Sequence, residues 1–175
     1  LGDLGYYNDY NYSQPTPLNV AYIGSYLRAR IPGQKVEIFK NPIELLERIT
    51  EEPPYLVGLS HYQWNSNLNL KIIEAAKQAN RNTISVLGGP QFDPTDQEWM
   101  RNFFSARPQI DFHVEREGEG TFTELIQNLF DVGVDTYKHQ IDKWPAALFS
   151  YDHNSQTVLY NPDGEFERMD LSNIP

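Results

Sequence analysis

Three clusters of small, polar and aromatic residues in the middle of this chain each follow a short apolar run. The runs span residues 55–60, 83–87 and 110–114, and the clusters that follow them span residues 60–65, 88–91 and 115–120. In an open α/β sheet, the carboxyl ends of parallel strands meet at one edge, where ligands bind near the point at which the strand order reverses. We therefore expect the clusters to form one ligand-binding crevice. Its candidate binding residues are Ser60, His61, Tyr62, Trp64, Asn65, Gly88, Gly89, Pro90, Gln91, Glu117, Gly118, Glu119 and Gly120.

The residue types in the first two clusters suit a large, flat ligand. Gly88 and Gly89 have no side chain, so the backbone there can approach a planar ring or its tail closely. The Ser60 hydroxyl can hold an amide or a phosphate, and Tyr62 and Trp64 offer aromatic surface to an apolar ring edge. A tight turn at the two glycines, without any ligand, is an equally open interpretation.

Catalytic residues and metal ligands are not indicated. Ser60 is not part of a Gly-x-Ser-x-Gly sequence, so a hydrolase triad is not expected. The histidines at positions 61, 113, 139 and 153 are far apart and lack metal-ligand spacing. Residues 117–120 lack the spacing of a phosphate-binding loop, and Glu117 and Glu119 also suit a role in shaping a loop and capping a helix. We predict a site that binds a ligand without chemistry of its own.

The composition limits the kind of partner. The chain has 175 residues, enough for one α/β domain with an additional element. A net charge of -10 and a pI near 4.8 argue against nucleic acids and membranes, because both reward clustered Lys and Arg. The absence of cysteine excludes disulfides and a cysteine-ligated iron–sulfur cluster within this chain. We therefore expect a cytoplasmic protein that binds a small molecule or another protein.

Apolar runs alternate with amphipathic stretches along most of the chain. Helices are predicted at about residues 17–31, 41–52, 66–80, from 95 onward and at 121–130, with capping boxes at 41–44, 95–98 and 121–124. A further strand is predicted at residues 36–39, and residues 147–151 and 157–160 are predicted to form an antiparallel hairpin. The pattern predicts an α/β fold with a doubly wound, mostly parallel, Rossmann-like or flavodoxin-like sheet and a C-terminal β-hairpin appendage.

The first strand of such a sheet is the least complete part of the pattern. Residues 1–5 are long enough only for the end of a strand, and the chain begins with Leu rather than Met. We therefore expect a fragment in which the body of the first strand lies before Leu1. The strand at residues 36–39 would then expose unpaired backbone, which favours a homodimer or strand exchange.

Several motifs, in this order, resemble the cobalamin-binding domain at the amino terminus of many radical S-adenosylmethionine proteins. They lie at residues 17–27, 57–60, 62–65, 87–90 and 117–122, and the resemblance extends from about residue 15 to residue 130. The resemblance implies that cobalamin is the partner of this chain. It also implies that Ser60, Gly88 and Gly89 belong to the cobalamin site.

The resemblance further implies an accessory domain that catalyses nothing by itself. Residues 1–135 would form the cobalamin-binding-type domain, and residues 136–175 a hairpin and linker toward its own C-terminal catalytic domain. That domain, absent from this chain, would hold S-adenosylmethionine and a 4Fe-4S cluster, whose Cys-x-x-x-Cys-x-x-Cys metal-binding motif is not found here. The parent enzyme would carry out radical methylation, rearrangement or related chemistry.

One departure from related proteins keeps a second hypothesis open. In cobalamin-dependent mutases and methyltransferases, the loop after the first strand carries an Asp-x-His-x-x-Gly motif whose histidine binds cobalt. Residues 2–14 contain no histidine, so this mode of ligation is excluded. The alternative is a cofactor-free recognition or scaffold module of the same fold, which would present its acidic surface to the catalytic domain or to substrate.

Overall fold

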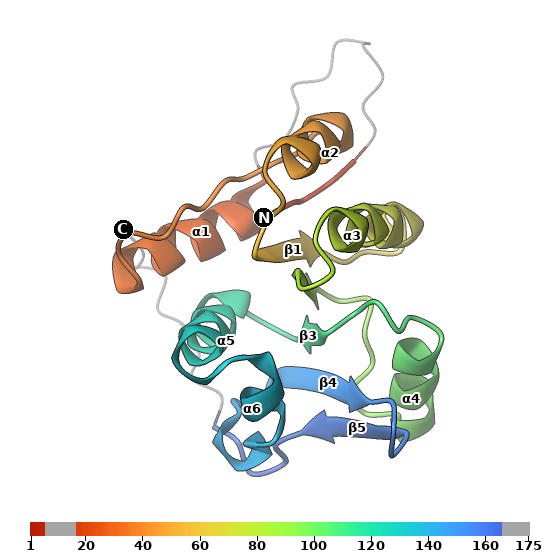
Figure 1. The fold of residues 1–175 in the computed structure, drawn as a ribbon. Coiled ribbons are helices and arrows are strands. Elements are labelled where there is room, and N and C mark those ends of the chain that lie inside the picture. Colours follow the sequence, from red (N-terminus) through yellow and green to blue (C-terminus); the bar gives the residue numbers. More distant parts are fainter. Residues whose placement is uncertain (6–16, 166–175) are drawn as a thin grey trace.

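The apolar runs of the sequence form the strands of one sheet. The computed structural model describes residues 1–5 and 17–165, and its strands, in hydrogen-bonded order, are β1 (Leu56–Ser60), β2 (Ile84–Gly88), β3 (Phe112–Val114), β4 (Leu148–Asp152) and β5 (Thr157–Tyr160). β1, β2 and β3 are parallel. They are buried almost throughout because helices cover both faces of the sheet (Figure 1), which explains why apolar residues predominate in them. The prediction of a mostly parallel α/β sheet is confirmed.

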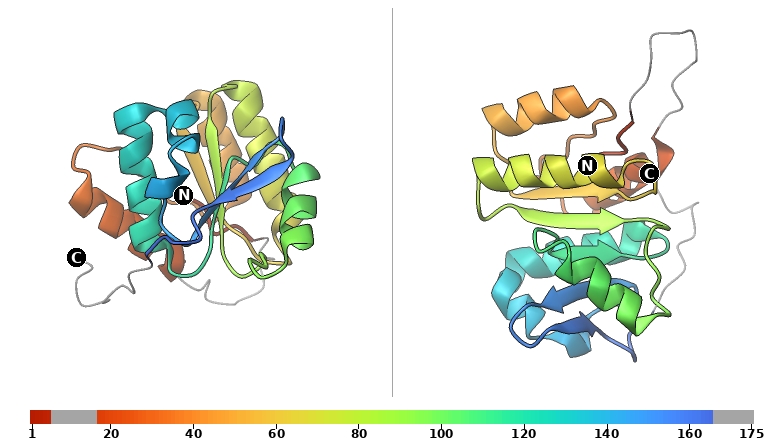
Figure 2. Two further views of the ribbon diagram at one scale, coloured as in Figure 1. Left: turned by 90° about the horizontal axis from the view of Figure 1, so that it is seen from below. Right: turned by 90° about the vertical axis from the view of Figure 1, so that its right-hand side faces the viewer.

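The helices form one layer on each face of this sheet. They are α1 (Leu18–Arg30), α2 (Pro42–Glu51), α3 (Ser66–Ala79), α4 (Gln97–Ser105), α5 (Gly118–Val132) and α6 (Val134–Lys138), and a 3-10 turn follows at Ile141–Lys143. α1 and α5 contact each other on one face, and α2 and α3 contact each other on the opposite face (Figures 1 and 2). α4 contacts β4 and β5. The sheet is therefore doubly wound, as predicted.

The predicted C-terminal hairpin extends the sheet at its edge. β4 pairs with β3 in antiparallel register, with His113 opposite Phe149, and β5 pairs antiparallel with β4. The turn between β4 and β5 is held by Asp152, whose Oδ1 accepts a hydrogen bond from the Asn154 amide at 2.8 Å and whose Oδ2 accepts one from Ser155 Oγ at 2.7 Å. The hairpin is thus appended to the parallel strands through β3.

Leu1–Asp3 occupies the place of the first strand. Gly2 makes parallel bridges to Phe39 on one side and to Leu59 of β1 on the other. The Gly2 carbonyl accepts a hydrogen bond from the Ser60 amide at 2.8 Å. The next segment of the chain to join the sheet, at Phe39, lies on one side of Leu1–Asp3, and the following strand, β1, lies on the other side. The strand order therefore reverses at Leu1–Asp3. In α/β sheets, ligands bind at such a reversal.

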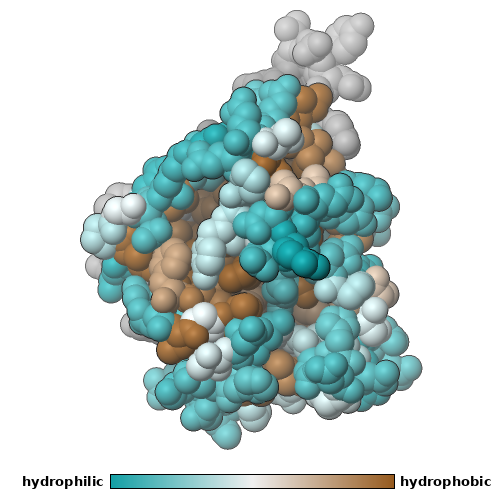
Figure 3. Space-filling model, viewed as in Figure 1, coloured by the Kyte–Doolittle hydropathy of each residue, from teal (hydrophilic) through white to brown (hydrophobic). Residues whose placement is uncertain are grey.

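The strand predicted at residues 36–39 is not formed. Of these residues Phe39 alone is bridged, to Gly2. Beside this segment lies a cavity of about 300 Å³, with Val36, Tyr55 and Phe130 among its lining residues. Figure 3 shows apolar side chains in the hollow between the α1–α2 connection and α5. The homodimer expected from unpaired backbone in this region stays a prediction.

The capping boxes predicted for α2 and α4 have different outcomes. Asn41 caps α2 as predicted, since its Oδ1 accepts a hydrogen bond from the Ile43 amide at 2.9 Å. α4 is capped by Asp96 rather than Thr95, because Asp96 Oδ1 accepts hydrogen bonds from the next helical amides at 2.9 Å. Thr95 instead donates its hydroxyl to Asp93 at 2.6 Å in the preceding turn.

α5 begins three residues before the predicted capping box. Its N-cap is Glu117 and its first residue is Gly118, so Thr121 lies inside the helix with a buried side chain. A Cβ atom at Gly118 would lie 3.0 Å from Ile23 Cδ1 of α1. The small residue therefore lets α5 start directly after β3 and close to α1. This brings the first turn of α5 to the carboxyl edge of the sheet.

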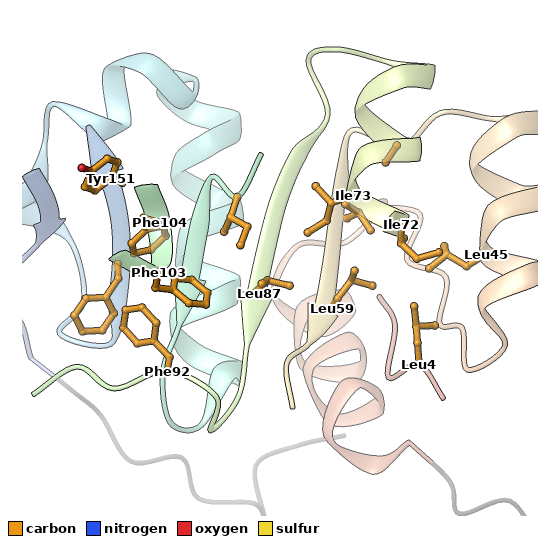
Figure 4. Close-up of a cluster of buried hydrophobic side chains, with 14 of the residues drawn as sticks. Leu4, Leu45, Leu59, Ile72, Ile73, Leu87, Phe92, Phe103, Phe104 and Tyr151 are labelled. Carbon is orange, nitrogen blue, oxygen red and sulfur yellow. The ribbon is translucent and has the colours of Figure 1, made fainter. Parts of the chain in front are cut away.

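An aromatic cluster fills the core on the face covered by α2, α3 and α4. Figure 4 shows Phe92, Phe103 and Phe104 on one side of Leu87, with aliphatic residues of α3 on the other side. The rings of Phe92 and Phe103 meet edge to face with centroids 5.3 Å apart. This dense packing lies beneath the loops that follow β1 and β2 and holds them in place.

His61 and His113 are buried in this aromatic cluster. Their ring centroids are 5.9 Å apart, and His113 stacks on Phe92 at 4.2 Å. Burial, with a smaller contribution from Arg107, lowers the pKa of His61 from its ordinary value of 6.5 to about 4. Burial also lowers the pKa of His113 well below its ordinary value, and neighbouring His61 adds to this effect. Neither ring nitrogen of His113 has a hydrogen-bond partner among the described residues. Both histidines are therefore neutral at pH 7.

These histidines predict a loss of stability in mild acid. In the unfolded chain they take up protons near pH 6.5, whereas His61 in the folded chain does so near 4. Their contribution to stability is thus complete above pH 6.5 and is lost as the pH falls toward 4. When the pH falls from 7.5 to 5, the free energy of unfolding should therefore decrease by about 2 kcal/mol for each of the two histidines. Urea unfolding at the two pH values measures this change.

A variant identifies the source of the pH dependence. His113→Leu should remove about half of the loss without lowering stability at pH 7.5, because leucine has no unpaired nitrogen atoms to bury. His139→Gln, at an exposed position, is the matched control and should leave the loss unchanged. An undiminished loss in His113→Leu would show that other groups cause the pH dependence.

Candidate functional site

A deep cavity opens at the carboxyl edge of the sheet, between α1 and α5. Its volume is about 790 Å³, and Leu1 and residues 58–60 form part of its wall, beside the point where the strand order reverses. Val20 and Ile23 of α1 and Phe122 of α5 provide apolar walls. The volume falls in the range of about 300–1,000 Å³ that is usual for small-molecule sites.

Glycines on two strands leave room for this cavity. Gly58 of β1 and Gly88 of β2 both line it. A Cβ atom at Gly58 would lie 2.9 Å from Leu1 Cδ2 and 3.2 Å from Phe122 Cε2. A Cβ atom at Gly88 would meet Val114 at 3.4 Å, so the remainder of a larger side chain would enter the cavity. The cavity thus depends on the absence of side chains at Gly58 and Gly88 on this face of the sheet.

Polar and aromatic side chains surround the mouth of the cavity. The Ser60 hydroxyl donates a hydrogen bond to Asp3 Oδ1 at 2.6 Å, and the Tyr62 hydroxyl accepts one from the Asn19 amide at 3.2 Å. Trp64 is 76% exposed and stacks on Tyr62, with ring centroids 4.5 Å apart and planes 6° apart. A stacked pair of a half-buried tyrosine and an exposed tryptophan beside an apolar cavity offers a flat surface for an apolar ring.

Asn65 shapes the loop that carries the aromatic pair. Its Oδ1 accepts a hydrogen bond from the Tyr62 amide at 2.8 Å, and its Nδ2 donates one to the Ser60 carbonyl at 2.9 Å. Asn69 of α3 donates to the same carbonyl at 2.8 Å. Asn65 is buried and does not line the cavity, so it positions the loop.

His61 also supports the site from beneath. Its ring lies in the aromatic core, 5.6 Å from the Phe103 ring, and its Nε2 is 3.1 Å from Ser66 Oγ. Its backbone amide donates to the Gly88 carbonyl at 2.6 Å, which joins the loop after β1 to the end of β2. The His61 side chain therefore does not reach the cavity.

Gly89 is required by the backbone itself. Its φ is +134°, which residues with a side chain rarely adopt, and a Cβ atom there would lie 2.8 Å from the His61 carbonyl oxygen. The two interpretations of the glycine pair thus apply to different residues. Gly89 makes the tight turn, and Gly88 leaves the cavity open.

The cavity brings together part of the predicted set. The predicted residues that line it are Ser60, Tyr62, Gly88, Gly89, Pro90, Glu117, Gly118 and Glu119. The predicted residues that do not line it are His61, Trp64, Asn65, Gln91 and Gly120. The sequence interpretation missed a further group of lining residues, which includes Asn19, Val20, Ile23, Gly58, Val86, Val114, Arg116 and Phe122. Several of these lie in the motifs at residues 17–27, 57–60 and 117–122, so the motifs contained the missing signal.

The described residues contain no cluster of metal ligands. Across residues 1–5 and 17–165, no three side chains of His, Asp or Glu are grouped so as to hold a metal ion. All four histidines are in this described part, and none of them lines the cavity. In the same part of the chain, no helix has the length and apolar character needed to cross a membrane.

An apolar cavity at the reversal of the strand order in an α/β domain has the position and character of sites that bind organic ligands. Comparison with protein families identifies the kind of domain. Residues 11–126 match the family described as B12 binding domain, and the chain belongs to this family.

Two longer proteins are similar to part of the chain. The cobalamin-dependent radical SAM methyltransferase TokK of Streptomyces tokunonensis is 30% identical over 93 residues, which are 50% of this chain and 13% of the relative. The 2-(S-pantetheinyl)-carbapenam-3-carboxylate methyltransferase of Streptantibioticus cattleyicolor is 29% identical over 93 residues, with the same coverage of 50% and 13%. The matched region is thus a small part of each relative.

The two neighbouring glycines predict different effects of the same substitution. Gly89→Ala should lower the free energy of unfolding by about 1–3 kcal/mol, because alanine is strained at this φ and meets the His61 carbonyl. Gly88→Ala should change it by less than about 1 kcal/mol, because its Cβ has room. Urea unfolding of both variants measures the difference, and equal stability of the two would contradict the assigned roles.

Proposed function

We propose that this chain binds cobalamin, with the nucleotide tail in the cavity between α1 and α5 and the corrin ring over the carboxyl edge of the sheet. The observation that carries the proposal is the apolar cavity of about 790 Å³ at the strand reversal, in a chain of the B12 binding domain family. Such a cavity favours the burial of an apolar, aromatic base.

The residues around the cavity fit such a ligand. Gly58 and Gly88 leave space that any side chain would reduce. The flat surface of Tyr62 and Trp64 suits the apolar edge of a macrocycle, and the Ser60 hydroxyl at the mouth suits a polar group of the tail. These residues would bind and orient the ligand, and none of them is assigned a catalytic step.

The relatives suggest the setting in which the domain acts. Both are described as methyltransferases, one of them as a cobalamin-dependent radical SAM enzyme. In that setting residues 1–135 form the cobalamin-binding domain, and residues 136–175 lead toward a catalytic domain that holds S-adenosylmethionine and a 4Fe-4S cluster. When bound, cobalamin supplies a cobalt centre that carries a methyl group or exchanges electrons in methyl transfer, rearrangement or related radical chemistry.

Retention of hydroxocobalamin tests the proposal. The chain is incubated with hydroxocobalamin and desalted, and its visible spectrum is recorded. The expected result is a corrinoid spectrum in proportion to protein. Gly88→Val should weaken retention by about tenfold or more, because its side chain enters the cavity.

The controls separate the ligand site from the fold. Thr157→Val places the same side chain on β5, at an exposed position outside the cavity, and should retain corrinoid normally. Thermal unfolding followed by circular dichroism reports whether Gly88→Val is folded. Absence of corrinoid on the unmodified chain would favour the cofactor-free recognition or scaffold module, for which the lack of a cobalt-binding histidine is the supporting observation.

The positions of the histidines predict how cobalt is coordinated. Because no histidine lines the cavity, bound cobalt should have no histidine ligand from this chain. After reduction to cob(II)alamin, the electron paramagnetic resonance spectrum should contain no nitrogen splitting from a histidine, so the unmodified chain and His61→Ala should give the same spectrum. A clear nitrogen splitting that disappears in His61→Ala would contradict this assignment.

A further inference from the structure

Glu119 is a buried carboxylate in the wall of the cavity. It is the second residue of α5, is 8% exposed and lines the cavity near the carboxyl edge of the sheet. The N-terminal end of a helix stabilises a negative charge at this position. Its Oε2, however, has no hydrogen-bond partner among the described residues. A buried carboxylate oxygen without a donor is unfavourable, so the group is suited to a donor that arrives with the ligand.

Three other polar residues that line the cavity, Ser60, Asn19 and Tyr62, have hydrogen-bond partners of their own. The Ser60 hydroxyl donates to Asp3, and the Asn19 amide donates to the Tyr62 hydroxyl. The Asn19 side-chain oxygen in turn accepts a hydrogen bond from the backbone amide of the next residue at 2.8 Å. None of these hydrogen bonds involves Glu119. Within the described part of the chain, the acceptor at Glu119 is thus available to a ligand.

The position of Glu119 limits the chemistry of the group that it can bind. One turn further along α5, Phe122 forms an apolar wall, and Ile23 of α1 lies against Gly118 at the start of the helix. Arg116 also lines the cavity, but its charge is paired with Glu115 at 2.8 Å. A phosphate or carboxylate beside Glu119 would therefore face a like charge in poorly hydrated surroundings. A neutral N–H or O–H group would instead form a hydrogen bond to a charged acceptor.

We propose that Glu119 accepts a hydrogen bond from a neutral N–H or O–H group of the bound ligand. The inference rests on the proposed function above and assigns a role to one residue of that site. Cobalamin contains two sources of such a donor. The corrin ring carries amide side chains, and the nucleotide tail carries a ribose hydroxyl.

Paired variants and paired ligands test the proposal. Glu119→Gln keeps the size of the side chain and removes its charge, and Glu119→Leu removes the acceptor. Glu124→Gln, which removes a charge from an exposed position of the same helix, is the matched control. Affinities are measured by titration with hydroxocobalamin and with cobinamide, which has the ring amides but lacks the nucleotide. Thermal unfolding of each variant reports its fold.

The expected result is a loss of affinity for hydroxocobalamin of about tenfold in Glu119→Gln and about 10–100-fold in Glu119→Leu, with no change in Glu124→Gln. An equal loss for cobinamide assigns the donor to a ring amide, and an unchanged affinity for cobinamide assigns it to the nucleotide tail. If Glu119→Leu does not fold, the result for Glu119→Gln decides.

Two other outcomes have different meanings. If the unmodified chain binds hydroxocobalamin and both Glu119 variants bind it equally well, the proposed hydrogen bond is wrong while the proposed function stands. If the unmodified chain binds neither corrinoid, the proposed function fails, and the role of Glu119 in corrinoid binding fails with it.

Discussion

The candidate site depends on one short segment, Leu1–Asp3, being held between two neighbours in the sheet. Gly2 is bridged to Phe39 on one side and to Leu59 on the other. After this segment the chain first adds Phe39 on one side of it and then adds β1 on the other side. The connections that follow Leu1–Asp3 and β1 therefore diverge and leave a crevice between them. The hydrogen bond from Ser60 to Asp3 joins the two sides of the reversal at the mouth of the cavity.

The two faces of the sheet are packed differently, and the difference locates the cavity. On the face of α2, α3 and α4, aromatic rings and aliphatic side chains fill the core, and His61 and His113 lie among them. On the face of α1 and α5, Gly58 and Gly88 replace side chains near the carboxyl ends of the strands. Empty apolar volume weakens a fold. The dense packing on the other face stabilises the fold and also holds in place the loops after β1 and β2, which shape the mouth of the cavity.

Much of the fold could be predicted from the sequence because its signals are local. Short apolar runs at β1, β2 and β3, alternating with amphipathic stretches, indicated a mostly parallel α/β sheet, and Asn41 marked the start of α2. The predictions failed where a tertiary contact decides. The segment at residues 36–39 has the sequence of a strand, but in the described part of the chain it is bridged only at Phe39, to Gly2. α5 starts early because Gly118 fits against α1, which no local pattern reveals.

The same distinction applies to the site. Loops at strand ends could be identified from the sequence, and Ser60, Tyr62 and Gly88 of the predicted set line the cavity. Whether a loop residue faces the cavity or the core depends on packing, and the side chains of Asn65 and His61 face away from the cavity. The walls contributed by α1, including Val20 and Ile23, look like ordinary core positions in the sequence. They become part of a site only because α1 crosses near the start of α5.

We propose that the cavity between α1 and α5 holds part of a cobalamin molecule. A crystal structure of the chain grown with hydroxocobalamin tests it most directly, because the electron density locates the ligand without reference to any variant. We expect electron density for the nucleotide tail in the cavity lined by Gly58, Gly88 and Phe122, with the corrin ring at the carboxyl edge of the sheet. A corrinoid bound at another surface, with the cavity filled by water alone, would contradict it.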